Sequence, residues 1–356
     1  MSGLFKIAVF AYLVFMPARL PAAYSGGFVV TEEENFALKM RGRIQSRYEY
    51  SSEGEGEDLS SFYLRRVRLD LRGHVYDSAL SFRIMPKLAR TANLRDGWIN
   101  YRINSKAAVR FGHMSVPFHR QRDVSSTRQH FAEYSGPSAA YQSPGGYDLG
   151  LMLHGSFSKT GWKYALGVFD GAGRNVKESH SSGNMASLRI GGPIFGKPSA
   201  DETSVAAPAQ PTLALGLGLQ GALKNEMYDW SLGRSQSRRA DYAAATADIH
   251  FALGRFSGAF DYYLRHVNPE ETGNYNSDAY LVTAGLMLIK DRLEAVGRYS
   301  ETTPDRDDSD RAARQAGLGL NLYHQGHDWK TRINYLVNET SEDTDGVFLV
   351  EMHLSF

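Results

Sequence analysis

The last eleven residues of the chain alternate between apolar and polar side chains and end on an aromatic residue. The apolar positions are Phe348, Val350, Met352, Leu354 and Phe356. Because successive side chains of a β-strand point to opposite faces, this segment would form a strand with one apolar face and one mostly polar face. An unbroken apolar face suits contact with lipid, so the pattern predicts a strand of an outer-membrane β-barrel.

The same alternation recurs along the chain in about sixteen segments, an even number as in bacterial barrels. We expect strands near residues 36–50, 61–75, 79–88, 95–103, 107–113, 147–157, 161–169, 184–191, 212–222, 242–251, 255–266, 278–289, 292–300, 313–323, 327–338 and 346–356. Only alternate residues of such strands meet lipid, so the negative mean hydropathy of the chain agrees with a membrane location. The predicted fold is an all-β, antiparallel transmembrane barrel.

The N-terminus has the features of an export signal. Lys6 precedes an apolar run over residues 7–16, and small residues follow up to Ser25. The run is about ten residues long, too short for a helix that crosses a bilayer of roughly 30 Å. The sequence therefore predicts a cleaved signal peptide over residues 1–25 and a barrel domain over residues 26–356. We expect export through the periplasm to the outer membrane of a Gram-negative bacterium, which suits a chain without cysteine.

The links between the expected strands alternate in length. Tight links near residues 104–106, 158–160, 290–291 and 325–327 are separated by longer ones. Short turns of such barrels face the periplasm and long loops face outward. Residues 192–211 form a long link where a short turn is due, and we interpret this segment as a long periplasmic turn without a function of its own.

Basic residues gather on the polar faces of the expected strands, where they outnumber acidic ones by roughly three to one if phase is assigned by alternation. Arg or Lys facing lipid at the bilayer midplane costs about 2–4 kcal/mol, so these charges should face the lumen. The predicted cationic ladder along the pore comprises Lys39, Arg41, Arg43, Arg66, Arg68, Arg72, Arg83, Arg102 and Arg110. Such a ladder would attract anions. The alternative is that inward arginines pair with inward acids and brace the wall.

Several segments resemble the phosphate-selective porin O and P family. They are Leu38–Tyr48 (LKMRGRIQSRY), Phe62–Gly73 (FYLRRVRLDLRG), Val109–Phe118 (VRFGHMSVPF), Ser125-Ser126 and Phe131-Ala132-Glu133. The resemblance is strongest over residues 36–135. It implies a sixteen-stranded, anion-selective channel that admits a homotrimeric assembly, with an arginine ladder that leads to a constriction loop bearing a phosphate-binding lysine.

The longest expected external loop, Met114 to Gly146, follows the fifth strand, where porin loops commonly fold inward. It is our candidate constriction, and an ordinary solvated surface loop is the alternative. Its candidate site residues are Arg120, Arg122, Thr127, Arg128 and Glu133. Aligned on the two serines, Thr127 stands where the family has its lysine, and the loop contains no lysine. Arg128 could still bind an oxyanion, because a guanidinium grips two oxygens.

Other classes of function have weaker support in the sequence. His154 and Ser156 share one strand face, as do Asp248 and His250, but neither pair belongs to a recognisable nucleophile motif. The acidic cluster at residues 305–310 lacks the glycine and glutamate of an EF-hand loop. We therefore expect no enzyme activity and no metal site. A structural or adhesive barrel with a plugged lumen remains the alternative.

The sequence thus predicts an outer-membrane channel for passive diffusion of small hydrophilic anions. Phosphate, pyrophosphate and polyphosphate stay open as solutes, and general anion diffusion is the broader expectation. The expected surroundings are outer-membrane lipid and lipopolysaccharide. We expect no cofactor and no nucleic-acid partner.

Overall fold

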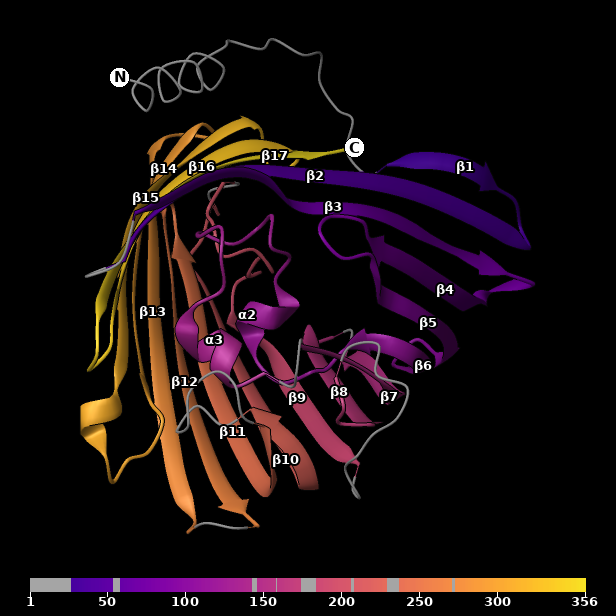
Figure 1. The fold of residues 1–356 in the computed structure, drawn as a ribbon. Helices are drawn as coiled ribbons and strands as arrows, with labels where there is room; N and C mark the ends of the chain where they lie inside the picture. The colour runs from indigo at the N-terminus through magenta and orange to yellow at the C-terminus, as the bar shows by residue number, and fades with distance from the viewer. Residues whose placement is uncertain are drawn as a thin grey trace.

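A sixteen-stranded antiparallel barrel dominates the computed structural model of this chain (Figure 1). The structure describes residues 27–53, 58–142, 146–157, 159–173, 184–205, 208–228, 237–270 and 273–356. The predicted signal peptide, residues 1–25, lies outside the described residues. The all-β barrel predicted from alternation is confirmed.

All sixteen expected segments are strands. The first eight are β2 (Phe36–Glu53), β3 (Leu59–Val75), β4 (Asp77–Lys87), β5 (Asn93–Asn104), β6 (Ala107–Ser115), β7 (Tyr147–Phe157), β8 (Trp162–Phe169) and β9 (Met185–Phe195). The second eight are β10 (Thr212–Tyr228), β11 (Ser237–Leu253), β12 (Phe256–Pro269), β13 (Tyr275–Ile289), β14 (Leu293–Thr303), β15 (Ala313–Gln325), β16 (Trp329–Glu339) and β17 (Thr344–Ser355). β7 has the expected bounds, whereas β10 and β11 extend further toward the link that joins them.

The last strand closes the barrel on the first. β17 pairs with β2 from Asp345 opposite Glu53 to Ser355 opposite Arg43. The terminal residue continues this ladder, because the Phe356 backbone N–H donates to the Gly42 carbonyl at 3.0 Å. A Cβ at Gly42 would lie 2.3 Å from the Phe356 ring, so any other residue there would force the ring to shift. Closure removes the open sheet edges that lipid cannot hydrogen-bond.

A short strand that sequence patterning did not predict, β1 (Phe28–Glu32), lies outside this closed ring. It pairs with residues 37–40 of β2, beside which it lies in Figure 1. β17 reaches only to Arg43, so these residues of β2 extend past their neighbour and leave backbone groups to be paired. β1 supplies that pairing.

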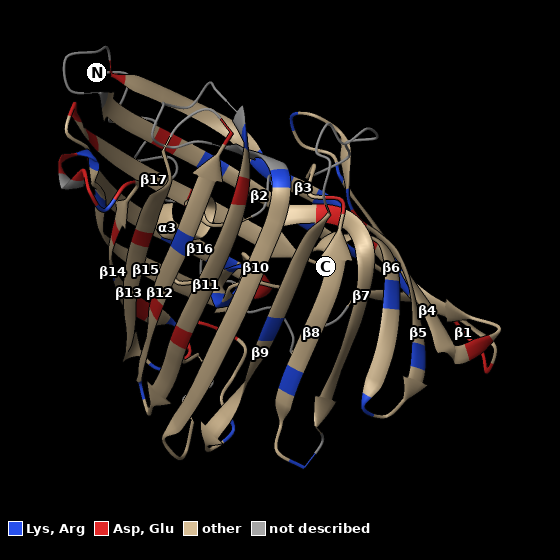
Figure 2. Ribbon diagram, turned by 90° about the horizontal axis from the view of Figure 1, so that it is seen from below, with Lys and Arg blue, Asp and Glu red and all other residues tan. Residues whose placement is uncertain are grey.

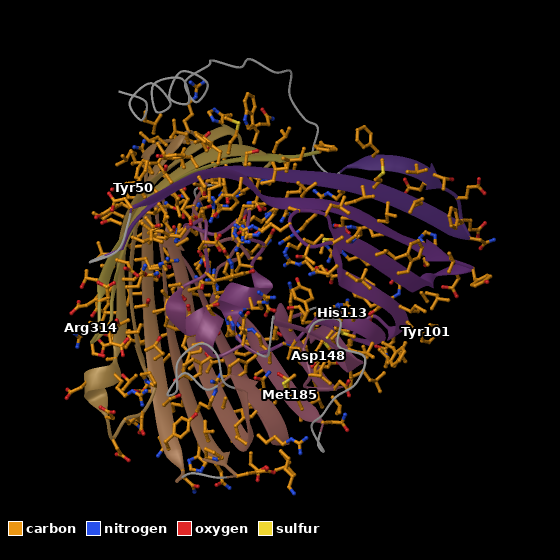
Figure 3. The ribbon with its side chains drawn as sticks, in the orientation of Figure 1. Tyr50, Tyr101, His113, Asp148, Met185 and Arg314 are labelled. Atoms are coloured by element: carbon orange, nitrogen blue, oxygen red, sulfur yellow. The ribbon has the colours of Figure 1, made fainter. Side chains whose placement is uncertain are left out.

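The two faces of the wall differ as the alternation requires. On β7, Leu151 is 52% exposed while Met152 beside it is 6% exposed. On β16, Lys330 and Arg332 are fully buried, whereas Tyr335 is exposed. In Figure 3 the exposed Tyr101 lies at the rim of the wall, and the buried Met185 lies further in. Outward side chains are therefore apolar, whereas the buried inward face combines charged residues such as Arg332 with apolar ones such as Met152 and Met185.

In the residues that the structure describes, three short helical segments lie in the links between strands. They are α2 (Arg120–Asp123), α3 (Gly136–Ala140) and η3 (Ser309–Arg311). In the described ranges, no helix has the length and apolar character needed to span a membrane.

The outward face of β15 offers a direct test of this orientation. Leu318 is 72% exposed, and we expect Leu318→Arg to lower the free energy of unfolding in lipid by about 2–4 kcal/mol. Leu318→Ala is the control, because it removes the side chain without adding a charge. Chemical denaturation in lipid vesicles measures both, and equal losses in the two variants would contradict a lipid-facing Leu318.

Candidate functional site

The described residues between β6 and β7, 116–142 and 146, contact the buried polar face of distant strands. Arg332 of β16 donates to the carbonyls of Ser126 and Phe131, both at 2.9 Å. Arg265 of β12 donates to the carbonyl of Ala140 at 2.9 Å. Figure 1 shows α2 and α3, which belong to this segment, surrounded by the strands. The segment is therefore fixed by arginines from several parts of the wall.

Glu133 is the main ionic anchor of this segment. Its carboxylate lies 2.6 Å from Arg47, 2.5 Å from Arg65 and 3.4 Å from Arg66. Burial opposes the charged form, but the three guanidinium groups outweigh it and hold the pKa of Glu133 well below its ordinary value of 4.5. Glu133 is therefore a carboxylate that three arginines share.

A second buried acid extends this network into the last strand. Glu351 of β17 lies 2.7 Å from Arg47 and also pairs with Arg332. Gln45 donates to the same carboxylate at 3.0 Å. Charges removed from water in this way need close partners, and here each acid has several. This arginine–glutamate network therefore braces the wall.

Arg65 and Arg95 face inward because β-bulges interrupt the alternation of side chains along their strands. The β2–β3 register slips opposite Arg65, and the β4–β5 register slips opposite Arg95. Each bulge inserts one extra residue, so two successive side chains turn to the inside. Sequence analysis missed both residues for this reason. The signal available was energetic, since strict alternation would have placed these two cations in lipid.

Arg47 was also missing from the predicted ladder, although no bulge is involved. It has the same parity as Arg41 and Arg43, so the alternation of β2 alone places it inward. It is 2% exposed, and it joins Glu133 to Glu351.

A cavity of about 350 Å³ lies beside this network. Its lining contains nine arginines: Arg41, Arg43, Arg68, Arg72, Arg83, Arg95, Arg110, Arg122 and Arg128. Four acids also line it: Asp70, Asp96, Asp123 and Asp328. Figure 2 shows Lys and Arg as blue bands across several neighbouring strands. Basic side chains thus exceed acidic ones around this space.

Some of these arginines have partners that fix their orientation. Arg83 donates to both oxygens of Asp70, at 2.7 and 2.9 Å, and Arg72 pairs with the same carboxylate. Arg110 lies over the ring of Trp98 with 4.1 Å to the centroid. Stacking of this kind orients a guanidinium without neutralising it.

The remaining strand arginines leave a surplus of positive charge. In the part of the chain that the structure describes, Arg41, Arg43 and Arg68 form no ion pair with an acid. Arg43 donates instead to the hydroxyls of Ser125 and Ser126, at 3.3 and 3.4 Å. These three arginines come from β2 and β3 and face the cavity together.

The arginines around the cavity also act on a nearby phenol. Burial raises the pKa of Tyr134, but Arg122, Arg95 and other arginines outweigh burial and lower it to about 8. A phenol shifts in this direction where the local potential is positive. The region around the cavity therefore favours negative charge.

The predicted ladder is divided among four places. Arg41, Arg43, Arg68, Arg72, Arg83 and Arg110 line the cavity. Arg66 belongs to the network of Glu133. Lys39 lies 3.9 Å from Glu32 of β1, and Arg102 is exposed and donates to Ser78 at 3.0 Å.

The predicted loop residues also occupy different surroundings. Arg122 and Thr127 line the cavity, and the Thr127 hydroxyl lies 3.1 Å from that of Ser125. Arg128 lines the cavity too, but it donates to Asp201 at 2.8 and 3.0 Å. Arg120 donates to the Asp201 carbonyl at 3.4 Å.

The link between β9 and β10, which we expected to be a long periplasmic turn without a function of its own, makes polar contacts with the segment between β6 and β7. Asp201 contacts the segment between β6 and β7, and Glu202 is 2% exposed. Carboxylates and hydroxyls of this link supply hydrogen-bonding partners that the sequence did not suggest.

The other candidate pairs from the sequence have structural partners. The His154 ring lies 2.6 Å from Asn100, and Asp248 pairs with Arg189 at 2.8 Å. In the described ranges, no group of three or more His, Asp or Glu side chains is arranged to hold a metal ion.

A closed sixteen-stranded barrel with a charged cavity defines the porin class of outer-membrane channels. The family model described as phosphate-selective porin O and P matches residues 38–347, and the chain belongs to this family. Fold and family together indicate an outer-membrane channel.

Several solved structures share the fold. An anion-selective porin from Comamonas acidovorans is 13% identical, with a TM-score of 0.63 over 90% of this chain and 100% of that chain. The trimer form of in-vitro folded OmpT, an outer-membrane protein of Vibrio cholerae, is 11% identical, with a TM-score of 0.65 over 91% and 100%. An uncharacterized protein of Aquifex aeolicus (strain VF5) is 22% identical and matches over 90% of this chain and 87% of its own length.

Removal of the shared carboxylate tests the anchoring network. We expect Glu133→Gln to lower the free energy of unfolding by about 2–3 kcal/mol, because three arginines lose a common partner. Glu32→Gln is the matched control, since it removes an exposed pair with Lys39 and should have little effect. Equal stability of Glu133→Gln and the wild type in denaturant titration would contradict the anchoring role.

The same carboxylate predicts a pH dependence. Its folded pKa lies below the ordinary 4.5, so its stabilising contribution is complete above that value and is lost as the pH falls toward the folded pKa. The stability difference between wild type and Glu133→Gln should therefore be full at pH 7 and shrink below about pH 4. A difference that stays constant over this range would contradict the assignment.

Proposed function

We propose that this chain is an anion-preferring channel through which small hydrophilic solutes diffuse passively across the outer membrane. The observation that carries the proposal is the cavity, where Arg41, Arg43 and Arg68 form no ion pair with an acid in the described part of the chain. Their surplus charge would raise the local concentration of anions and repel cations.

The proposed mechanism divides the work between the wall and the segment after β6. Strand-borne arginines set the electric field, and the segment between β6 and β7 narrows the passage, as we predict for a constriction loop. An anion that loses part of its hydration shell would gain guanidinium donors in exchange. Asp70 and Asp96 line the same cavity and would weaken binding, which lets the anion leave again.

The proposed solutes are oxyanions, with phosphate or polyphosphate among them. A guanidinium presents several N–H donors in a plane, which matches two oxygens of one anion. The segment after β6 has Thr127 and Arg128 in place of the family's lysine, so oxyanion binding here would depend on guanidinium groups rather than on an ammonium.

We also propose a homotrimer whose outer surface lies in lipid and lipopolysaccharide. The support is the V. cholerae protein of the same fold, which was solved in a trimer form. Chemical cross-linking in detergent tests this assembly. The predicted cleavage after Ser25 is tested separately by the mass of the mature chain, which should begin at Gly26.

A plugged structural or adhesive barrel is the second candidate function. It is favoured by the number of buried polar contacts that fix the segment after β6, such as the bond from Ala132 N–H to Asn334 at 3.0 Å. A plugged barrel would show no single-channel conductance in a planar bilayer, whereas the proposed channel conducts.

Ion selectivity tests the role of the surplus arginines. We expect the double variant Arg43→Gln/Arg68→Gln to lower the anion-to-cation permeability ratio by about threefold, because two charges without an ionic partner leave the cavity. Reversal potential in a potassium chloride gradient measures this ratio. Arg102→Gln is the matched control, since Arg102 is exposed and lies outside the cavity. An unchanged ratio in the double variant would sink the proposal.

Block of chloride current tests oxyanion binding. Added phosphate or pyrophosphate should reduce the current in a saturable way, and Arg68→Gln should weaken this block about threefold. An anion preference without block would leave a general anion channel.

A further inference from the structure

The link between β9 and β10, described over residues 196–205 and 208–211, meets the segment after β6 at Arg128. Arg128 uses one terminal nitrogen, Nη1, to reach both carboxylate oxygens of Asp201, at 2.8 and 3.0 Å. The Arg128 side chain is 49% exposed and lines the cavity, while the Asp201 side chain is 13% exposed. The Arg128 guanidinium thus faces the cavity while it is already paired with the carboxylate of Asp201.

The position of Asp201 is fixed by its neighbours. Glu202 donates its backbone N–H to the Arg128 carbonyl at 3.0 Å. The Glu202 carboxylate accepts from the backbone N–H of His130 at 2.8 Å and from Gln121 at 3.5 Å. Both the main chain and the side chains of this link therefore bind the segment after β6.

Thr203 and Ser204, the next residues of the link, attach it to the wall. The Thr203 hydroxyl lies 3.3 Å from the His327 ring, and Ser204 donates to the Phe256 carbonyl at 3.3 Å. These residues connect the link to the turn before β16 and to the start of β12. The carboxylate of Asp201 is consequently presented to Arg128 by a held segment.

Asp201 is charged at neutral pH. Burial opposes ionisation, but hydrogen bonds from His327 and Arg128 outweigh it and lower the pKa of Asp201 to about 2. His327 lies 3.4 Å from the same carboxylate. The carboxylate is therefore an anion throughout the physiological range.

We propose that Asp201 is a specificity-determining residue that acts as a built-in anion. Its carboxylate occupies Arg128, so that a permeating anion must share this guanidinium or displace Asp201 from it. The two sides of the cavity then differ. The arginines of β2 and β3 are open to solute, whereas Arg128 is already paired with Asp201. This arrangement would limit the residence time of a bound anion and favour its release. The inference rests on the proposed anion channel.

The experiment measures block of chloride current by inorganic phosphate in planar bilayers. Asp201→Asn should tighten the block about threefold and raise the anion-to-cation permeability ratio, because Arg128 becomes free to bind solute. Asp201→Ala makes the same charge change without an amide, and it decides the question if Asp201→Asn fails to fold. A block that is unchanged or weaker in the folded variant overturns the inference.

A matched control separates this role from a general change in field. Asp328 also lines the cavity, and in the described residues its carboxylate pairs with no arginine of the cavity. Asp328→Asn removes the same charge and should tighten the block by less than Asp201→Asn does. Equal effects of the two variants would overturn the assignment to Arg128.

The inference and the proposed function fail in different ways. A wild-type channel without anion preference, or without conductance, refutes the proposed function whatever the variants do. An anion-preferring wild type whose block is the same after loss of Asp201 refutes only the role of Asp201.

Discussion

The lipid surroundings impose the constraint on which the rest of this structure depends. Hydrocarbon offers no hydrogen-bonding partner to the backbone, so every strand must pair on both sides and the sheet must close. Closure between β2 and β17 meets this requirement. It also creates one apolar and one polar face, and the cost of a cation in lipid directs arginine and lysine inward. The charged interior follows from the same constraint as the barrel itself.

Inside the barrel, arginine has two distinct uses. Around Glu133 and Glu351, buried arginines share carboxylates and hold the segment after β6 against the wall. Around the cavity, Arg41, Arg43 and Arg68 form no ion pair with an acid in the described part of the chain. The buried, paired charges hold the segment after β6 in place. The charges without an ionic partner produce a positive electric field in the cavity. The proposed selectivity needs both, because a field acts on a solute only where the passage is narrow.

Local rules predicted the fold well and the site only in part. Period-two alternation located the sixteen strands, and charge cost located most of the cavity arginines. Alternation failed at Arg65 and Arg95, where bulges add a residue and reverse the facing of a side chain. The sequence did not predict β1, because its pairing depends on how far β2 extends beyond the end of β17. A register between two strands is a property of the pair and is not written in either strand alone.

The sequence by itself determined that this chain forms a closed barrel with an apolar outside and a basic inside, because both follow from the alternation of side chains along each strand. Only the tertiary structure decided which charges remain free. Arg66 and Arg68 are near neighbours in one strand, yet one joins the network of Glu133 and the other faces the cavity. Likewise Arg128 pairs with Asp201, which is far from it in the sequence. Ion pairing acts over a few ångströms in space, and residues far apart in sequence supply the partners.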